Sequence, residues 1–163
     1  MKRTGLCVTT CCVVLLGCES RQPPGLDASS HYAASKMVAT RAGDLVWNDL
    51  GLIPGVKIAV LSGNPGQPGH YVVRLKFPPN TRMPAHWHPL AEYATLLSGT
   101  LLLGMGEKED PAALQPYLPG TFLVVPPRMP HYGRSEGEAI FELSGPGPYE
   151  VVFVNPADDP RKK

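Results

Sequence analysis

The stretch that decides the fold reads Pro84-Ala85-His86-Trp87-His88-Pro89-Leu90-Ala91-Glu92. Side chains alternate between the two faces of a β-strand, so His86 and His88 share one face while Trp87 points to the other. Glu92 lies again at an even offset, and a brief turn at Pro89 brings its carboxylate to the same side. Two imidazoles and one carboxylate suit Fe(II), Mn(II) or Zn(II). The stretch therefore predicts a metal site built on strands.

A second stretch, from Gly120 to His131, places another histidine at the end of an apolar strand. The spacing His86-x-His88-x3-Glu92-x6-Gly99 resembles the first motif of the cupin superfamily, and Gly120 through Pro126, with Pro130 and His131, resembles the second. The two motifs agree in order and separation. The resemblance implies an all-β fold, a double-stranded β-helix (jelly-roll) cupin barrel with the site inside it. It also implies turn glycines at Gly99 and Gly120, and four metal ligands: His86, His88, Glu92 and His131.

One residue departs from the family pattern. Arg128 stands where cupins usually carry glycine, so the turn leading to His131 is where this chain is expected to differ. A His-x-His pair beside an acid also occurs on solvated edges, and a lone histidine more often makes a structural hydrogen bond. All four residues together, inside a barrel pattern, favour metal binding over a degenerate cupin without metal.

Short apolar or alternating runs bounded by Gly and Pro fill the chain from residue 44 onward. The 163 residues include 17 Gly and 19 Pro but only 4 Phe and 2 Trp, which favours short strands and tight turns. A barrel domain is therefore expected over residues 44–160, with residues 107–115 forming a helical turn or an extended loop. Strands are expected at 56–62, 70–77, 92–97, 100–105, 121–125, 139–143 and 149–154, and turns at 63–66, 78–80, 98–99 and 145–148.

Residues 1–18 have the pattern of an export signal. Lys2 and Arg3 precede a short apolar stretch that is too short to span a bilayer. The sequence Leu15-Leu16-Gly17-Cys18 resembles the lipobox of bacterial lipoproteins, which implies lipidation of Cys18; the alternative is a plain secretory signal. Residues 19–43 are polar and predict a linker. We expect a lipoprotein on the periplasmic side, anchored in the outer membrane, or otherwise a protein secreted to the periplasm.

The formal net charge is +1, with both signs scattered along the chain, so a nucleic acid partner is not expected. We expect a small-molecule ligand or substrate, contact with the membrane only through a lipid anchor and, by resemblance to cupins, a possible homodimer. Outside the cytosol, metal availability favours Zn(II) or Mn(II) over Fe(II) for the one divalent ion.

Three functions fit these residues. The leading hypothesis is a metal-dependent enzyme of oxygenase, isomerase or lyase type that acts on a small organic molecule. The alternatives are a non-catalytic cupin lipoprotein that binds a ligand or a metal, and a structural protein whose metal staples the barrel. No catalytic residue is assigned, although Glu92 is a candidate base. Arg74 either points inward toward a substrate carboxylate or lies on an exposed edge, and the same choice holds for Arg82 and Glu142.

Overall fold

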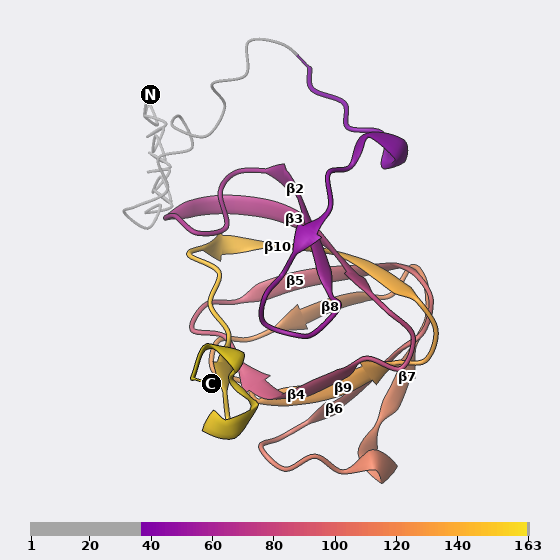
Figure 1. Ribbon diagram of the computed structural model, residues 1–163, viewed down its shortest axis with the longest axis vertical. Coiled ribbons are helices and arrows are strands. Elements are labelled where there is room, and N and C mark those ends of the chain that lie inside the picture. Colours follow the sequence, from indigo (N-terminus) through magenta and orange to yellow (C-terminus); the bar gives the residue numbers. More distant parts are fainter. Residues whose placement is uncertain (1–36, 163) are drawn as a thin grey trace, which may run out of the picture. The chain divides into compact units, whose positions relative to one another are not determined.

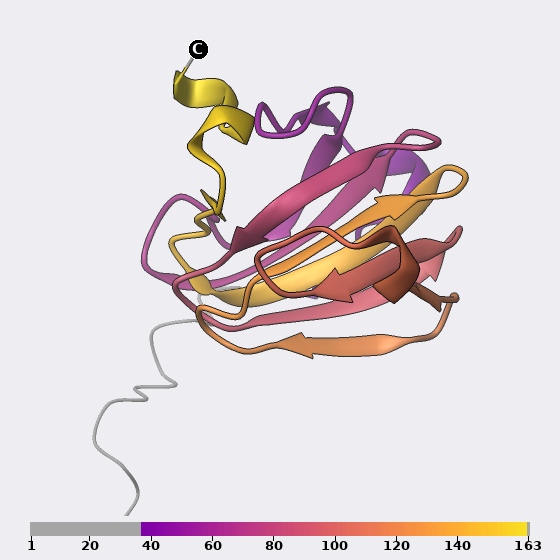
Figure 2. The same ribbon diagram turned by 90° about the horizontal axis from the view of Figure 1, so that it is seen from below.

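The computed structural model describes residues 37–162, which form two antiparallel sheets that face each other (Figures 1 and 2). Six strands form the first sheet, in the order β1 (Asn48–Asp49), β2 (Lys57–Ser62), β3 (Gly69–Phe77), β10 (Ala139–Gly147), β5 (Glu92–Ser98) and β8 (Phe122–Val125). Five strands form the second, in the order β11 (Val152–Phe153), β4 (Arg82–Trp87), β9 (His131–Ser135), β6 (Leu101–Met105) and β7 (Gln115–Tyr117). The predicted jelly-roll barrel is confirmed.

Short 3-10 turns complete the fold: η2 (Ala42–Asp44), η3 (Pro111–Ala113), η4 (Pro156–Asp158) and η5 (Pro160–Lys162). The segment at 107–115 was expected to be a helical turn or an extended loop, and η3 lies within it. Within residues 37–162, no helix has the length and hydrophobicity needed to cross a membrane.

Strands β3 and β10 show how alternation builds the core. Tyr71, Val73, Leu75 and Phe77 of β3 are buried, whereas the residues between them are partly exposed. Strand β10 repeats this pattern and pairs with β3 along its whole length. Phe77 stacks on Phe141 with ring centroids 5.1 Å apart. Burying a side chain of this size contributes roughly 1.5–3 kcal/mol, so the two inner faces hold the sheets together.

Three strand predictions need correction. The turn expected at 145–148 begins too early, because β10 continues to Gly147, paired with Gly69. The strand expected at 149–154 is only Val152–Phe153. His131 does not end the apolar strand β8 but begins a separate strand, β9, after a turn. Proline and glycine mark where strands end only approximately, because pairing with neighbours decides how far a strand extends.

The two glycines expected in turns are both found in the left-handed region. Gly99 has φ +80 and Gly120 has φ +90. A Cβ on Gly99 would lie 2.2 Å from the carbonyl oxygen of Glu138, so a side chain there would have to displace the backbone of the loop before β10. This turn returns the chain from β5 to β6, and therefore from one sheet to the other.

Candidate metal centre

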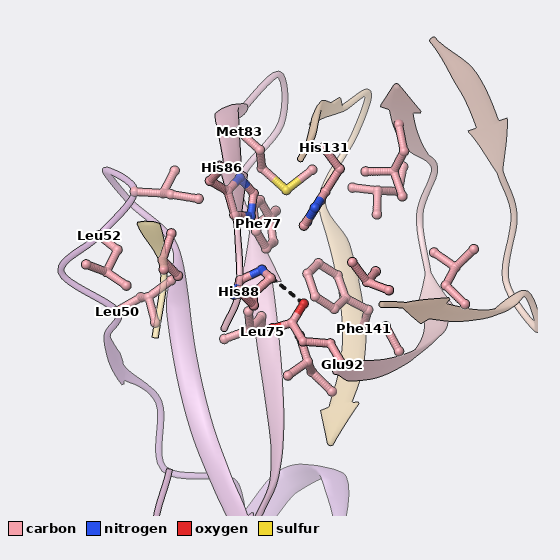
Figure 3. A pocket seen from close by; sticks show the side chains of 18 of the residues that line it. Leu50, Leu52, Leu75, Phe77, Met83, His86, His88, Glu92, His131 and Phe141 are labelled. Carbon is pink, nitrogen blue, oxygen red and sulfur yellow. Dashed lines mark ion pairs between the residues drawn. The ribbon is translucent and has the colours of Figure 1, made fainter. Parts of the chain in front are cut away.

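Four buried polar residues from both sheets lie close together inside the barrel (Figure 3). His86 on β4 pairs directly with His131, the first residue of β9. His88 follows the end of β4, and Glu92 begins β5 on the opposite sheet. Each of the four is no more than 7% exposed. The short connection from residue 88 to residue 92 crosses from one sheet to the other. Residues that are close in sequence therefore face one another across the interior of the barrel.

Each histidine is held in the same way, through its Nδ1 atom. His86 Nδ1 lies 2.7 Å from the carbonyl oxygen of Pro84, His88 Nδ1 2.8 Å from that of Glu150, and His131 Nδ1 3.0 Å from that of Met129. A carbonyl oxygen only accepts, so each Nδ1 carries the proton and donates it. This leaves each Nε2 without a proton and with a lone pair, the state in which histidine binds metals.

The three imidazoles are close enough to share one ion. Their ring centroids lie 4.3 Å apart for His86 and His131, 5.0 Å for His86 and His88, and 5.3 Å for His88 and His131. One ligand nitrogen from each lies within 4.8 Å of the others. The three buried histidines therefore form a group able to hold a metal ion.

Glu92 stands beside this group rather than within it. Its Oε2 lies 3.1 Å from His88 Nε2, but Glu92 does not join the set of ligand atoms that lie within 4.8 Å of one another. Its Oε1 is buried and has no hydrogen-bond partner among the described residues. The structure thus brings three of the four expected ligands together and places the fourth in contact with one of them.

Burial sets the protonation of the whole cluster. Desolvation lowers the pKa of His86 to about 3 and that of His88 to about 4, and it lowers the pKa of His131 as well. Desolvation also raises the pKa of Glu92 to about 8. The histidines are therefore neutral at pH 7 and ready to bind a cation, while the carboxyl keeps its proton in the absence of one.

Comparison with known proteins identifies the domain. Residues 73–145 match the family model described as cupin domain. The chain contains a cupin domain. No curated protein matches this chain.

Solved structures share the fold of this cupin domain. The polyketide cyclase RemF from Streptomyces resistomycificus superposes with a TM-score of 0.64 at 20% identity, over 77% of this chain and 90% of that one. An RmlC-like cupin from Shewanella frigidimarina NCIMB 400 gives 0.54 at 16% identity, over 69% and 93%. KdgF from Halomonas sp. gives 0.52 at 16% identity, over 66% and 93%. At these identities the likeness supports the fold alone.

Arg128, which stands where the family pattern has glycine, adopts a backbone conformation that favours glycine. Its φ is +60, in the left-handed region, and its N–H donates to the carbonyl oxygen of His88 over 2.8 Å. The turn therefore holds an arginine in a backbone conformation that favours glycine. Because that hydrogen bond joins the loop of His88 to the turn before His131, the conformation of Arg128 helps position two of the three histidines.

Tyr149 is a site residue that was not predicted from the sequence. This residue lines the cavity of the cupin domain, and its ring stacks on that of His88, with centroids 5.6 Å apart and planes 22° apart. Burial raises the pKa of Tyr149 well above its usual value, and the nearby Glu92 raises it further. The pairing of β11 with β4 carries Tyr149 and Glu150 to the site. Only its place at the start of an expected strand signalled this residue.

Three polar residues whose direction was left open point outward. Arg74 Nη2 lies 3.0 Å from Oε2 of Glu142, its cross-strand neighbour on the outer face of the first sheet. Arg82 binds Glu109 and Asp158. Neither arginine lines the cavity. Cys18 lies outside the described residues.

Proposed function

We propose that this cupin domain binds one divalent metal ion and uses it in an enzymatic reaction on a small organic molecule. The observation that carries the proposal is the common orientation of His86, His88 and His131. Each gives its Nδ1 proton to a backbone carbonyl, which leaves a lone pair on Nε2; Nε2 of His88 faces the Glu92 carboxyl at 3.1 Å. Among the described residues, Nε2 of His86 and Nε2 of His131 have no hydrogen-bond partner, whereas buried histidines kept only for internal hydrogen bonds are expected to use both ring nitrogens.

The residues present fit a divalent cation. Three neutral imidazoles and a neighbouring carboxyl are a donor set suited to Zn(II), Mn(II) or Fe(II). Glu92 Oε1 is buried and has no partner within residues 37–162, which is unfavourable unless a cation or a ligand contacts it. Bound there, the ion would supply Lewis-acid polarisation of a substrate oxygen. We propose Zn(II) or Mn(II), because both are available outside the cytosol.

Glu92 has two possible places in this site. As a fourth ligand it would lower the net charge of the centre. As a neighbour of the centre it would not bind the ion, and its carboxyl would hold or accept a proton beside His88. The substitution Glu92→Gln separates the two, because it removes the negative charge and keeps the size. A ligand role predicts a large loss of metal affinity, and a proton-holding role predicts retained metal with slower turnover.

Metal analysis of the purified protein tests the site. We expect about one transition metal ion per chain in the wild type and near none in His88→Ala. His70→Ala is the matched control, because His70 is exposed and does not line the cavity. A folded wild-type protein that takes up no metal from Zn(II), Mn(II) or Fe(II) solutions would refute the proposal.

Turnover distinguishes an enzyme from the other classes. A screen of carbonyl, phenolic and carboxylate compounds against the metal-loaded protein is expected to yield a product that His88→Ala does not form. A compound that binds only the loaded protein and is recovered unchanged would favour a binding module. Loss of the β-sheet circular dichroism signal on chelation would favour a metal that staples the barrel.

We also propose that the protein is exported and anchored through Cys18, after a signal at residues 1–18 and ahead of a linker at 19–43. The basic start, the short apolar stretch and the lipobox-like sequence support this. Expression of Cys18→Ala in a bacterial host is expected to move the protein from the membrane to the soluble fraction. An unchanged distribution would exclude the lipid anchor.

A further inference from the structure

The interior of the barrel is almost free of polar groups beyond the metal-facing cluster. Twenty residues line the cavity, and fifteen of them carry only hydrocarbon or thioether side chains. The other five are the three histidines, Glu92 and Tyr149. Among residues 37–162, no lysine, arginine, serine, threonine, asparagine or glutamine lines it. The cavity thus offers a ligand one phenol and one carboxyl, apart from the histidines.

Three cationic side chains on the strands of the domain are engaged outside the cavity. Arg74 is paired with Glu142 on the outer face of the first sheet, and Arg82 is paired with Glu109 and Asp158. Lys76 lies over the ring of Trp47, 4.7 Å from its centroid. None of these three lines the cavity. A substrate carboxylate or phosphate that entered the cavity would therefore find no cationic side chain to replace its hydration.

The energetic consequence is large. An ionised group moved into an apolar cavity without a counter-charge loses far more free energy of hydration than its contacts return. A bound metal ion would compensate the lost hydration only for the ligand atoms that it contacts directly. Hydrocarbon parts of a ligand gain free energy from the same walls in proportion to the area they bury. The cavity volume of about 60 Å³ restricts the enclosed part to a few heavy atoms.

We infer that the substrate is a neutral, largely hydrocarbon molecule whose only polar anchor is the oxygen or pair of oxygens that faces His86, His88 and His131. The inference rests on the proposed metal site and adds the class of substrate to it. Tyr149 can donate one hydrogen bond beside that anchor, since its ring stacks on His88. The rest of the substrate lies against the leucine, valine and phenylalanine side chains of both sheets.

Leu52 gives a way to test this class. It lines the cavity, is partly exposed, and belongs to the loop between β1 and β2 together with Leu50 (Figure 3). A lysine at position 52 can place its ammonium near the cavity while the stem covers the same surface. Leu118→Lys is the matched control, because Leu118 is 59% exposed and does not line the cavity.

The probes are butanohydroxamic acid and succinic monohydroxamic acid. They share a metal-binding head and a tail of the same length that ends in a methyl group or a carboxylate. Calorimetric titration of the Zn(II)-loaded protein is expected to give about tenfold tighter binding of the methyl-ended probe, or about 1.4 kcal/mol. In Leu52→Lys this preference is expected to shrink or reverse, and in Leu118→Lys it is expected to persist.

Two failures are distinguishable. Zinc content is measured before each titration, so a protein that holds no zinc and binds neither probe refutes the metal site itself. A zinc-loaded protein that binds both probes equally, prefers the carboxylate or binds neither overturns the substrate class and leaves the metal site standing. A preference for the methyl-ended probe that Leu52→Lys leaves unchanged would place the tail outside this cavity and would also overturn it.

Discussion

Arg82 and Glu92 are both ionisable residues on strands of the barrel, but they differ in burial and in the number of polar partners. The guanidinium of Arg82 is about half exposed, donates to both carboxylate oxygens of Glu109 and reaches Asp158 from the C-terminal turn η4. Glu92 is buried inside the barrel, touches only His88 Nε2 and leaves Oε1 without a partner among the described residues. The outer network satisfies its charges by itself, whereas the inner cluster is left incomplete.

The difference shows where stability and function are separated in this domain. Pairs on the outside join segments that are far apart in sequence, and water screens whatever charge remains. The polar groups in the interior are removed from water and lack a full set of hydrogen-bond partners, which raises the free energy of the metal-free protein. Incomplete buried polar groups are typical of binding sites, because a ligand supplies the missing partner.

The pH dependence of the metal-free protein tests the interior directly. His86 and His88 have lowered pKa values, so their contribution to stability is present above pH 6.5, the value in the unfolded chain, and is lost as pH falls toward about 4 and 3. Glu92 has a raised pKa, so its contribution is present below pH 4.5 and is lost as pH rises through about 8. We expect the free energy of unfolding to peak at about pH 6.5.

Glu92→Gln removes the loss of stability that the Glu92 carboxyl causes as pH rises. At pH 8 we expect the metal-free variant to be more stable than wild type by an amount on the order of a few kcal/mol, because each pKa unit corresponds to about 1.4 kcal/mol. Urea denaturation at pH 5, 6.5 and 8 measures it. Glu138→Gln is the control, since Glu138 is exposed. Equal stability of Glu92→Gln and wild type at all three pH values would show that the carboxyl is not held in an unfavourable state.

The outer network should respond more weakly. Arg82→Ala is expected to lower the free energy of unfolding by about 1 kcal/mol, because Arg82 is about half exposed and its partners Glu109 and Asp158 stay partly accessible to water. The loss should shrink when salt is raised to about 1 M, since exposed charges are screened. Arg134→Ala is the control: Arg134 is the cross-strand neighbour of Arg82 and makes no ion pair within the described part of the chain. A larger loss that does not depend on salt would mean that Arg82 acts through packing.

Much of the fold was predictable from local patterns. The alternation of buried residues in β3 and β10 follows from their sequences, and His86, His88 and Glu92, whose spacing suggested a common site, lie close together inside the barrel. The contacts that complete the site were not predictable in this way. Glu150 reaches His88, and Tyr149 stacks on it, only because β11 pairs with β4. Such pairing depends on the whole sheet and leaves no local signal.

The ion-pair partner of Arg74 could not be predicted from the sequence, although the direction of its side chain could. Arg74 lies in an apolar strand, and its side chain points outward because Tyr71, Val73 and Leu75 take the inner face. The parity of the strand implied this once one buried residue was known. The partner, Glu142, lies 68 positions away and is set by the register of β10 on β3. Register comes from the fit of two complete strands, so no single stretch encodes it.

Arg128 is the position where sequence and conformation disagree, and it gives the last test. A side chain in the left-handed region costs roughly 1 kcal/mol relative to glycine, partly offset by the greater freedom of glycine in the unfolded chain. We therefore expect Arg128→Gly to raise the free energy of unfolding by about 0.5 kcal/mol. Arg128→Ala keeps a Cβ and should give no gain.

Asn80 provides the matched comparison for Arg128. It also has a positive φ, of 57, but asparagine tolerates this region well, so Asn80→Gly should change stability less. Metal content should be unchanged in Arg128→Gly, because the hydrogen bond from residue 128 to the carbonyl of His88 is made by the backbone. If zinc affinity fell in this variant while stability rose, the strained turn would be holding His88 and His131 in place for the metal. The backbone strain at Arg128 would then contribute to metal binding in the interior, although the Arg128 side chain lies on the outer surface.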